Sequence, residues 1–216
     1  TVSAGTLALS GGSALADTAA VSVASGATLS VGTAETINTL ALSGTLSGTS
    51  ALTATTSATL TGGTVSTVLS TAALSSSGAS SLNSATTATT SATVTAGTLT
   101  LNNGSSLTSP TVSITGGTLA LGASNVLADT NAIVVNGGTF SLGTFSDTVG
   151  AVSIGTNGGS ITSSTGVLTG TGYTFSNTSP NTGTVSAILA GTGALIGESA
   201  LGRGLPELLY SITPLD

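Results

Sequence analysis

The chain has 216 residues, and only 8 of them are charged: one Lys or Arg and seven Asp or Glu. Gly, Ser and Thr fill 110 positions, as 31 Gly, 35 Ser and 44 Thr. The sequence has no Cys and no His, which excludes disulfides, thiolate or imidazole metal sites and a histidine general base. Because Arg203 is the only cationic side chain, we expect no binding of nucleic acid or of an anionic membrane surface.

Low complexity does not predict disorder here, because 39% of the residues are apolar and the net charge is only −6. Aromatic side chains make up 2% of the chain, so Leu, Val, Ile and Ala must form a thin core. No stretch approaches the roughly 18 consecutive apolar residues of a membrane helix, and no transmembrane segment is expected. The chain opens at Thr1 without Met or a signal sequence, as expected of a mature segment or a part of a longer protein.

Apolar residues alternate with small polar residues along the chain instead of recurring every three or four positions. This period of two predicts β-strands, and the branched side chains of Thr and Val favour the same conformation. Gly at this density disfavours helices. The clearest strand patterns are Thr6–Leu9, Thr28–Val31, Thr98–Leu101, Thr118–Leu121 and Thr139–Leu142.

A longer repeat organises these strand patterns. A glycine precedes each unit, and the mean spacing of roughly 19 residues is typical of repeat architectures. In the better units a second short strand pattern follows, as at residues 21–23. One glycine turn and two short strands per unit predict an all-β parallel β-helix (β-solenoid) of about nine coils, on the order of 43 Å long. The nine glycines are Gly5, Gly26, Gly44, Gly63, Gly78, Gly97, Gly117, Gly138 and Gly159.

The repeat divides the chain into three predicted regions. Residues 1–175 form the β-solenoid repeat domain, and residues 176–197 form a terminal coil or strand region. The pattern ends near Glu198, after which two of the four prolines and larger apolar side chains follow. Residues 198–216 are therefore expected to be a cap, a linker or a subunit-docking segment, because the last coil otherwise exposes an open strand edge.

Two stretches of the chain echo each other at a common offset of 112 in the numbering. Leu15–Thr18, with the sequence Leu-Ala-Asp-Thr, recurs as Leu127–Thr130, and Glu35–Ile37 corresponds to Asp147–Val149. The echo predicts that modules of two coils have been copied. In residues 53–95 the composition stays the same, but the positions of the repeat are less distinct.

These repeated sequence segments resemble those of a known family. Residues 13–31 followed by 35–37, and residues 135–142 followed by 147–149, resemble the passenger repeats of bacterial autotransporters and related giant surface β-helix, adhesin-like proteins. The resemblance covers about residues 1–175. It implies a secreted parallel β-helix that is displayed at the bacterial cell surface.

The acidic residues are the remaining candidates for chemistry. Asp17, Asp129 and Asp147 each precede a Thr, and we expect each to close an Asx-type turn with it. Calcium is the alternative, but it needs about six to eight oxygen ligands, and the dense calcium-binding nonapeptide repeat is missing. No hydroxyl has an activating base, and Arg203 stays protonated. We therefore expect no enzyme activity and no catalytic, cofactor-binding or metal-binding residue.

Threonine arrays suggest a further interpretation. Flat, uncharged Thr-x-Thr ladders on a solenoid face bind ice by ordering water, and Thr-x-Thr at residues 53–55 and 87–89 lies at one phase of the repeat. The unit between them is expected to place Ala72 and Leu74 at that phase, and the unit that begins at Gly117 to place Val126 and Ala128 there, so the ladder is not sustained. Ice binding is therefore a minor alternative.

Few aromatic side chains are present to anchor a partner. Phe140 falls on the inward position of its strand pattern and is expected in the core, whereas Tyr173 and Phe175 are expected to cover the end of the regular stack. Phe145 and Tyr210 complete the set of five. The scarcity of anchors favours a structural role over a binding role.

Two function classes remain. The first is a non-enzymatic, extracellular structural protein of the bacterial surface that forms or belongs to a fibre, stalk or matrix by stacking. We expect it to form a homo-oligomer or homopolymer end to end, because both ends look uncapped and almost no charge opposes pairing of strand edges. The alternative is an adhesin passenger module whose loops bind a surface, a glycan or a partner cell.

Overall fold

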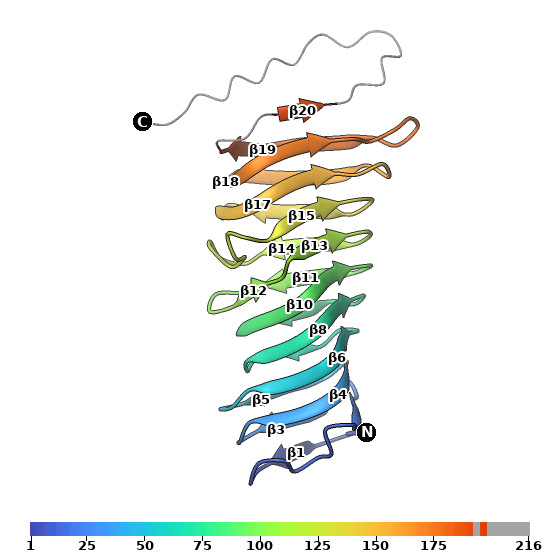
Figure 1. The fold of residues 1–216 in the computed structure, drawn as a ribbon, viewed down its shortest axis with the longest axis vertical. Helices are drawn as coiled ribbons and strands as arrows, with labels where there is room; N and C mark the ends of the chain where they lie inside the picture. The colour runs from blue at the N-terminus through green and yellow to red at the C-terminus, as the bar shows by residue number, and fades with distance from the viewer. Residues whose placement is uncertain (192–194, 198–216) are drawn as a thin grey trace.

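The computed structural model describes residues 1–191 and 195–197, which form one tall stack of β-strand coils (Figure 1). These residues contain twenty strands in one hydrogen-bonded sheet, and the strands pair in parallel. They contain no helix, and so no helix long and apolar enough to cross a membrane. The predicted fold, a parallel β-solenoid of about nine coils, is confirmed. The predicted cap, linker or docking segment, residues 198–216, lies outside the described residues.

Each coil contributes strand segments to three stacks that run along the solenoid. The first stack comprises β1 (Thr6–Leu9), β3 (Thr28–Val31), β5 (Thr45–Gly48), β7 (Thr64–Val65), β9 (Ser80–Leu82), β11 (Thr98–Leu101), β14 (Thr118–Leu121), β16 (Thr139–Gly143), and the first parts of β18 (Gly159–Phe175) and β19 (Gly183–Ala190).

The second stack begins with a short strand and continues through the C-terminal parts of longer strands. It comprises β2 (Ala20–Val23), β4 (Glu35–Leu42), β6 (Leu52–Leu60), β8 (Leu69–Ser76), β10 (Ala85–Val94), β13 (Thr111–Ile114), β15 (Ala132–Val135), β17 (Asp147–Ile154), the end of β18, and β20 (Leu195–Gly197).

The third stack uses the N-terminal parts of β4, β6, β8, β10 and β17, together with β12 (Ser106–Thr108), the middle of β18 and the end of β19. A loop replaces its strand in two coils. The loops follow β1 and β14, and the second touches the stack only through a single bridge between Leu107 and Leu127.

One column of outward-facing residues in the first stack gives the number of residues in each coil. Its ten positions pair in register, each with the next, and the longest step runs from Thr162 to Ser186. The mean step is about 20 residues, close to the predicted length of the repeat. The column consists of Thr6, Thr28, Thr45, Thr64, Ser81, Thr100, Ala120, Ser141, Thr162 and Ser186.

Glycine spacing marks the coils less faithfully than this column does. Ser81 donates its N–H to the carbonyl of Gly63, so Ser80 occupies the place in its coil that Gly63 occupies in the coil before. Gly78 therefore lies two residues before the position in its coil that corresponds to Gly63. Register is set by which side chains point inward, because a slip of one residue would move them to the surface.

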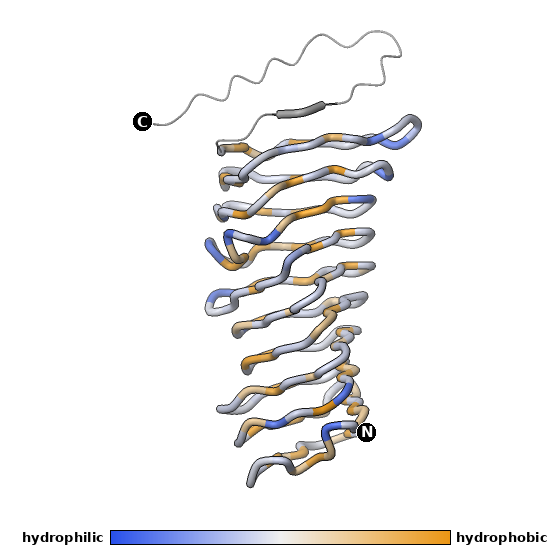
Figure 2. Tube along the Cα trace, in the orientation of Figure 1, coloured by the Kyte–Doolittle hydropathy of each residue, from blue (hydrophilic) through white to orange (hydrophobic). Residues whose placement is uncertain are grey.

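Inward side chains form continuous buried columns between the stacks. One of the two inward columns of the second stack holds only Leu, Val, Ile, Ala and one Tyr, and none of the nine residues listed below is more than 8% exposed. Figure 2 shows apolar positions recurring at every level of the solenoid. Phe140 is fully buried in the first stack, as predicted. The second-stack column consists of Val21, Leu40, Ala58, Leu74, Ala92, Val112, Ile133, Val152 and Tyr173.

Residues 53–95 hold small or polar side chains at inward positions, which is why their sequence pattern is blurred. Thr71, Ser76 and Thr86 are all buried. The Oγ of Ser76 lies between Leu60 and Val94 in its column and has no hydrogen-bond partner among the described residues. Backbone pairing with the coils above and below holds these strands in place despite their weak apolar pattern.

Two strands with the same sequence show how burial depends on place in the stack. β1 and β14 both read Thr-Leu-Ala-Leu after a glycine. Leu7 in β1, at the end of the stack, is 38% exposed, whereas Leu119 in β14 is fully buried between β11 and β16. The neighbouring coil, not the local sequence, completes the core.

This difference predicts unequal costs for the same substitution. We expect Leu119→Ala to lower the free energy of unfolding by about 2–5 kcal/mol, because it leaves a cavity in a buried column. Leu7→Ala should cost less than about 1 kcal/mol in dilute solution, since Leu7 has lost less contact with water. Guanidinium denaturation of both variants measures the difference. Equal costs would contradict the account.

Candidate functional site

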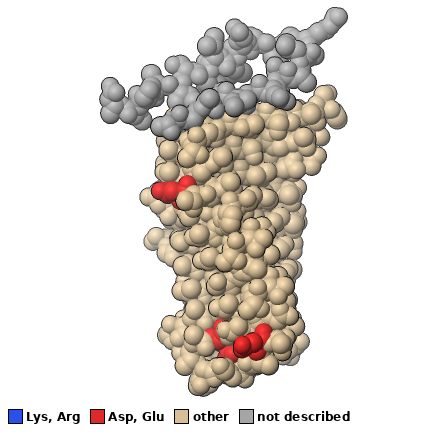
Figure 3. All heavy atoms as spheres, in the orientation of Figure 1, with Lys and Arg blue, Asp and Glu red and all other residues tan. Residues whose placement is uncertain are grey.

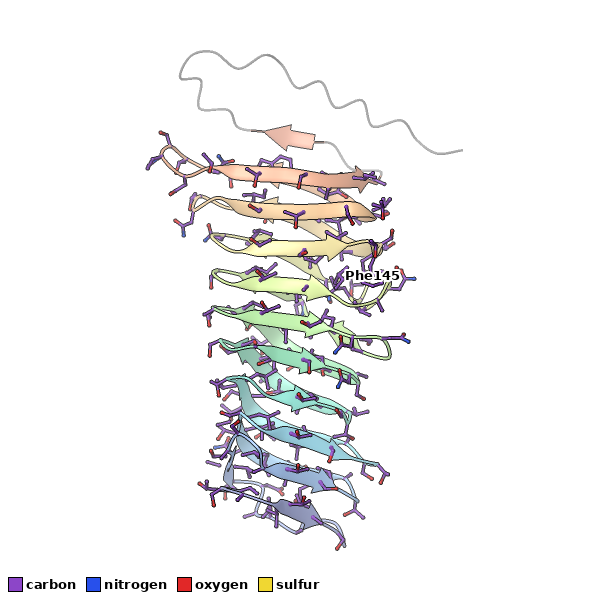
Figure 4. All side chains as sticks on the ribbon, turned by 180° about the vertical axis from the view of Figure 1, so that it is seen from behind. Phe145 is labelled. Carbon is purple, nitrogen blue, oxygen red and sulfur yellow. The ribbon has the colours of Figure 1, made fainter. Side chains whose placement is uncertain are left out.

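Thr and Ser cover the outward positions of the solenoid. Nine of the ten residues in the first-stack column from Thr6 to Ser186 are Thr or Ser. Figure 4 shows such short side chains along the strands. From β11 to β19 a second outward column lies beside the first on the same strands. Within this second column the Oγ of Ser160 lies 2.7 Å from Oγ1 of Thr184. This second column consists of Thr98, Thr118, Thr139, Ser160 and Thr184.

The third stack carries a column of Thr and Ser at the place where the sequence predicts an interrupted threonine ladder. Ser70, rather than Ala72 or Leu74, lies between Thr53 and Thr87. This part of the prediction was wrong because it counted from Gly63 in a coil that is two residues shorter there. The second predicted interruption, in the unit that begins at Gly117, is present, because a loop replaces the strand there. The outward column runs without interruption through Thr36, Thr53, Ser70, Thr87 and Thr108.

Two buried acids stand where the third stack lacks a strand. Asp147 is 2% exposed, and its Oδ2 accepts the N–H of Val126 at 2.9 Å and that of Leu127 at 3.2 Å. Both donors belong to the loop that follows β14 in the coil before. Because these donors lie in a loop rather than in a strand paired in register with β17, the carboxylate of Asp147 accepts them in place of a backbone carbonyl of β17.

Glu35 repeats this arrangement near the N-terminal end. Glu35 is 3% exposed, and its Oε2 accepts the N–H of Ala14 at 2.7 Å while Oε1 lies 3.4 Å from the N of Leu15. Glu35, Ala14 and Leu15 correspond to Asp147, Val126 and Leu127, because each lies 112 residues before its counterpart. The sequence echo is therefore a structural repeat of a loop and its buried acid.

The predicted Asx-type turns are replaced by other contacts. The turn at Asp17 is closed by the backbone, with the N–H of Ala19 donating to the carbonyl of Ala16 at 2.8 Å, and the turn at Asp129 is closed in the same way. The prediction was wrong for Asp147, which starts β17 with its carboxylate turned into the core. The structure brings together no group of three or more Asp or Glu side chains able to hold a metal within residues 1–191 and 195–197.

Burial dominates the electrostatics of Asp147. The pKa of its carboxyl is raised from 3.8 to about 6. Desolvation is the largest cause and the negative charge of Asp129 adds to it, while the N–H groups of Val126, Leu127 and Thr148 lower the pKa. Oδ1 of Asp147 is buried without a hydrogen-bond partner among the described residues, so the ionised form is incompletely solvated.

Charge is confined to two heights on the face that Figure 3 shows, where red atoms gather near one end and again farther up. Glu35 and Asp147 are buried, while Asp17 and Asp129 are exposed in the loops beside them. Most of the outer surface between these loops is therefore uncharged.

Hydrophilic segments, blue in Figure 2, lie in loops on both sides of the solenoid. They include residues 102–104 and 123–131, and Asn103 is exposed in the first of them. Phe145, labelled in Figure 4, lies in the loop between β16 and β17 and packs partly against the core. These loops are the most varied part of the described surface.

Tyr173 lies within the stack rather than over its end. It is 1% exposed in the second-stack column, and β20 pairs with it from above. Its hydroxyl lies 2.6 Å from the carbonyl oxygen of Leu168 and 2.7 Å from that of Ala190. Burial raises the pKa of Tyr173 to about 12, so it stays a neutral hydrogen-bond donor. Tyr210 and Arg203 lie outside the described residues.

Comparison of the chain with protein-family models, with curated proteins and with solved structures finds no match among any of the three. The features of this chain that bear on its function are therefore the solenoid, its Thr and Ser surface and its two loops with buried acids.

The raised pKa of Asp147 predicts a pH dependence of stability. Because the folded-state pKa exceeds the unfolded value, the native state binds the proton more tightly, and stability is highest below about pH 4 and falls as pH rises through about 6. The loss is about 3 kcal/mol. Asp147→Asn should remove this dependence, as measured by denaturation midpoints between about pH 4 and pH 7.5.

Asp129→Asn is the matched control for this test. Asp129 is exposed and contributes only the smallest of the effects on Asp147, so its variant should keep most of the pH dependence. An Asp147→Asn variant with the slope of the unsubstituted chain would show that another group governs the pH response.

Proposed function

We propose that this chain is a non-enzymatic structural protein of the bacterial surface, a secreted β-solenoid that forms or belongs to a fibre, stalk or matrix. The observation that carries the proposal is the unbroken run of parallel pairing over nine coils, from Thr6 to Ser186. A stack of this kind supplies length and stiffness, because each coil is bonded along its whole contour to the next.

The outer surface supports the same role. Thr and Ser side chains are neutral and short, and two of the four described acids are buried. Such a surface changes little with pH or salt, since it carries few groups that titrate or attract counter-ions. Chemical inertness of this kind suits an extracellular spacer or matrix subunit.

A second candidate function is an adhesin passenger module. The protruding loops at residues 102–104 and 123–131 favour it, because binding residues are disproportionately found on loops held by a rigid scaffold. Phe145 beside these loops is a partly buried aromatic side chain of the kind that anchors a partner.

The surface location is tested by antibody labelling of the cells that produce the protein. Antibodies raised against the purified chain should label intact cells, and external protease should remove the signal. Labelling that appears only after the cells are permeabilised would contradict the proposed extracellular role.

A bead assay separates the two candidate functions. Beads coated with the chain should not be retained on glycan arrays or bacterial cells above blank beads if the role is structural. Retention that falls about tenfold or more in Phe145→Ala would favour the adhesin. Thr174→Ala is the control, because Thr174 is exposed on the second stack and belongs to none of the loops.

A further inference from the structure

The N-terminal end of the solenoid exposes a strand edge that has a covered equivalent in the same molecule. β1 lies at this end in Figure 1 and pairs only with β3 among the described strands. β14 has the same sequence but lies between β11 and β16. The molecule thus contains one local structure twice, once with a full coil beneath it and once with only Val2 at that level, which bridges Val23 in the second stack.

The backbone at the two sites has the same shape. Gly5 before β1 has φ of +67° and Gly117 before β14 has φ of +63°. A side chain at Gly117 would collide with the coil beneath, where the carbonyl carbon of Ala96 lies 2.5 Å from an ideal Cβ. No atom lies within 4 Å of the same point at Gly5. The edge at Gly5 matches the covered edge but lacks the coil that covers it.

The exposed edge is apolar and carries no charge. Leu7 is 38% exposed where its equivalent Leu119 is fully buried, and Leu15 is partly buried where its equivalent Leu127 is 4% exposed. β1 contains no charged residue that would repel another strand. A further coil beneath β1 would bury these side chains.

We propose that the edge of β1 binds the opposite end of a second copy of this chain, at β19, in a head-to-tail arrangement. This inference rests on the proposed structural role, in which the solenoid is a stacking unit. β19 begins Gly-Thr-Val-Ser at residues 183–186, the pattern of Gly-Thr-Leu-Thr at residues 97–100 on which β14 lies. Parallel pairing needs strands that run in the same direction, and the far end of an identical solenoid supplies them.

The covered site fixes the register of this contact. Thr118 donates its N–H to the carbonyl of Gly97 at 2.8 Å. By the same geometry Thr6 donates to the carbonyl of Gly183 in the second copy, and Leu7 lies against Val185 there. Each copy offers both halves of the interface, so the contact is heterologous and extends into an open filament rather than a closed dimer.

The variant Gly5→Asn tests this interface. Asn tolerates a left-handed backbone, and the space around Gly5 is empty in the single chain, so the variant should fold. Its Cβ would collide with a coil beneath, as at Gly117. Sedimentation velocity and electron microscopy should show concentration-dependent filaments for the unsubstituted chain and only monomers for Gly5→Asn.

Gly143→Asn is the matched control. Gly143 also has a left-handed backbone, with φ of +61° and no atom within 4 Å of an added Cβ, but it lies in the middle of the stack. It should assemble like the unsubstituted chain. Circular dichroism and thermal melting should show both variants folded alike.

A second variant, Val185→Lys, establishes the polarity of the contact. Val185→Lys alone should also stay monomeric, and an equal mixture with Gly5→Asn should form pairs but no filaments, because each variant keeps one working end. Dimers of Val185→Lys alone would indicate pairing of two β1 edges. Filaments of Val185→Lys would indicate docking of residues 198–216 of a neighbour. Either result overturns the proposal.

Failure of this test remains distinguishable from failure of the proposed function. A chain that stays monomeric at every concentration, or a Gly5→Asn variant that still assembles, overturns the interface. Surface labelling of intact cells would still support the extracellular structural role in that case.

Discussion

Hydrogen bonding between neighbouring coils is the interaction on which the rest of this structure depends. A strand of four residues cannot satisfy its own backbone N–H and C=O groups, and an unsatisfied buried group costs free energy. Inside the stack, strands such as β3 and β14 meet another strand in register on both sides. The thin columns of Leu, Val and Ala seal these ladders from water, and the outward Thr and Ser side chains need contribute little to the core.

The same requirement explains the buried acids. Where a loop replaces a third-stack strand, its backbone N–H groups are not in register with the carbonyls of the strand in the next coil, and a carboxylate from that strand accepts them instead. Asp147 does so at the cost of a raised pKa and an unpartnered Oδ1. A protein with eight charges thus uses two of them inside the stack. Glu35 and Asp147 are therefore part of the buried structure of the solenoid rather than of its surface.

The fold class and repeat length could be predicted from the sequence, because period-two alternation and recurring glycines are local signals. The register could not be fixed everywhere. Counting from Gly63 gave Ala72 and Leu74 where the structure places Ser70, since inward burial rather than glycine spacing sets the pairing. The inward turn of Asp147 was missed because an Asp before Thr is typical of an exposed turn. The sequence echo between Glu35 and Asp147 was the available signal, because it paired each acid with a loop of the coil before.

Hydrogen exchange of the dilute, monomeric chain tests most directly whether the neighbouring coil stabilises each strand. Thr6–Leu9 and Thr118–Leu121 share one sequence after a glycine, so their intrinsic exchange rates match. We expect the amides of Thr118 and Ala120 to exchange at least about a hundredfold more slowly than those of Thr6 and Ala8, because only the former face a coil beneath. Equal exchange rates for the two strands would contradict this expectation.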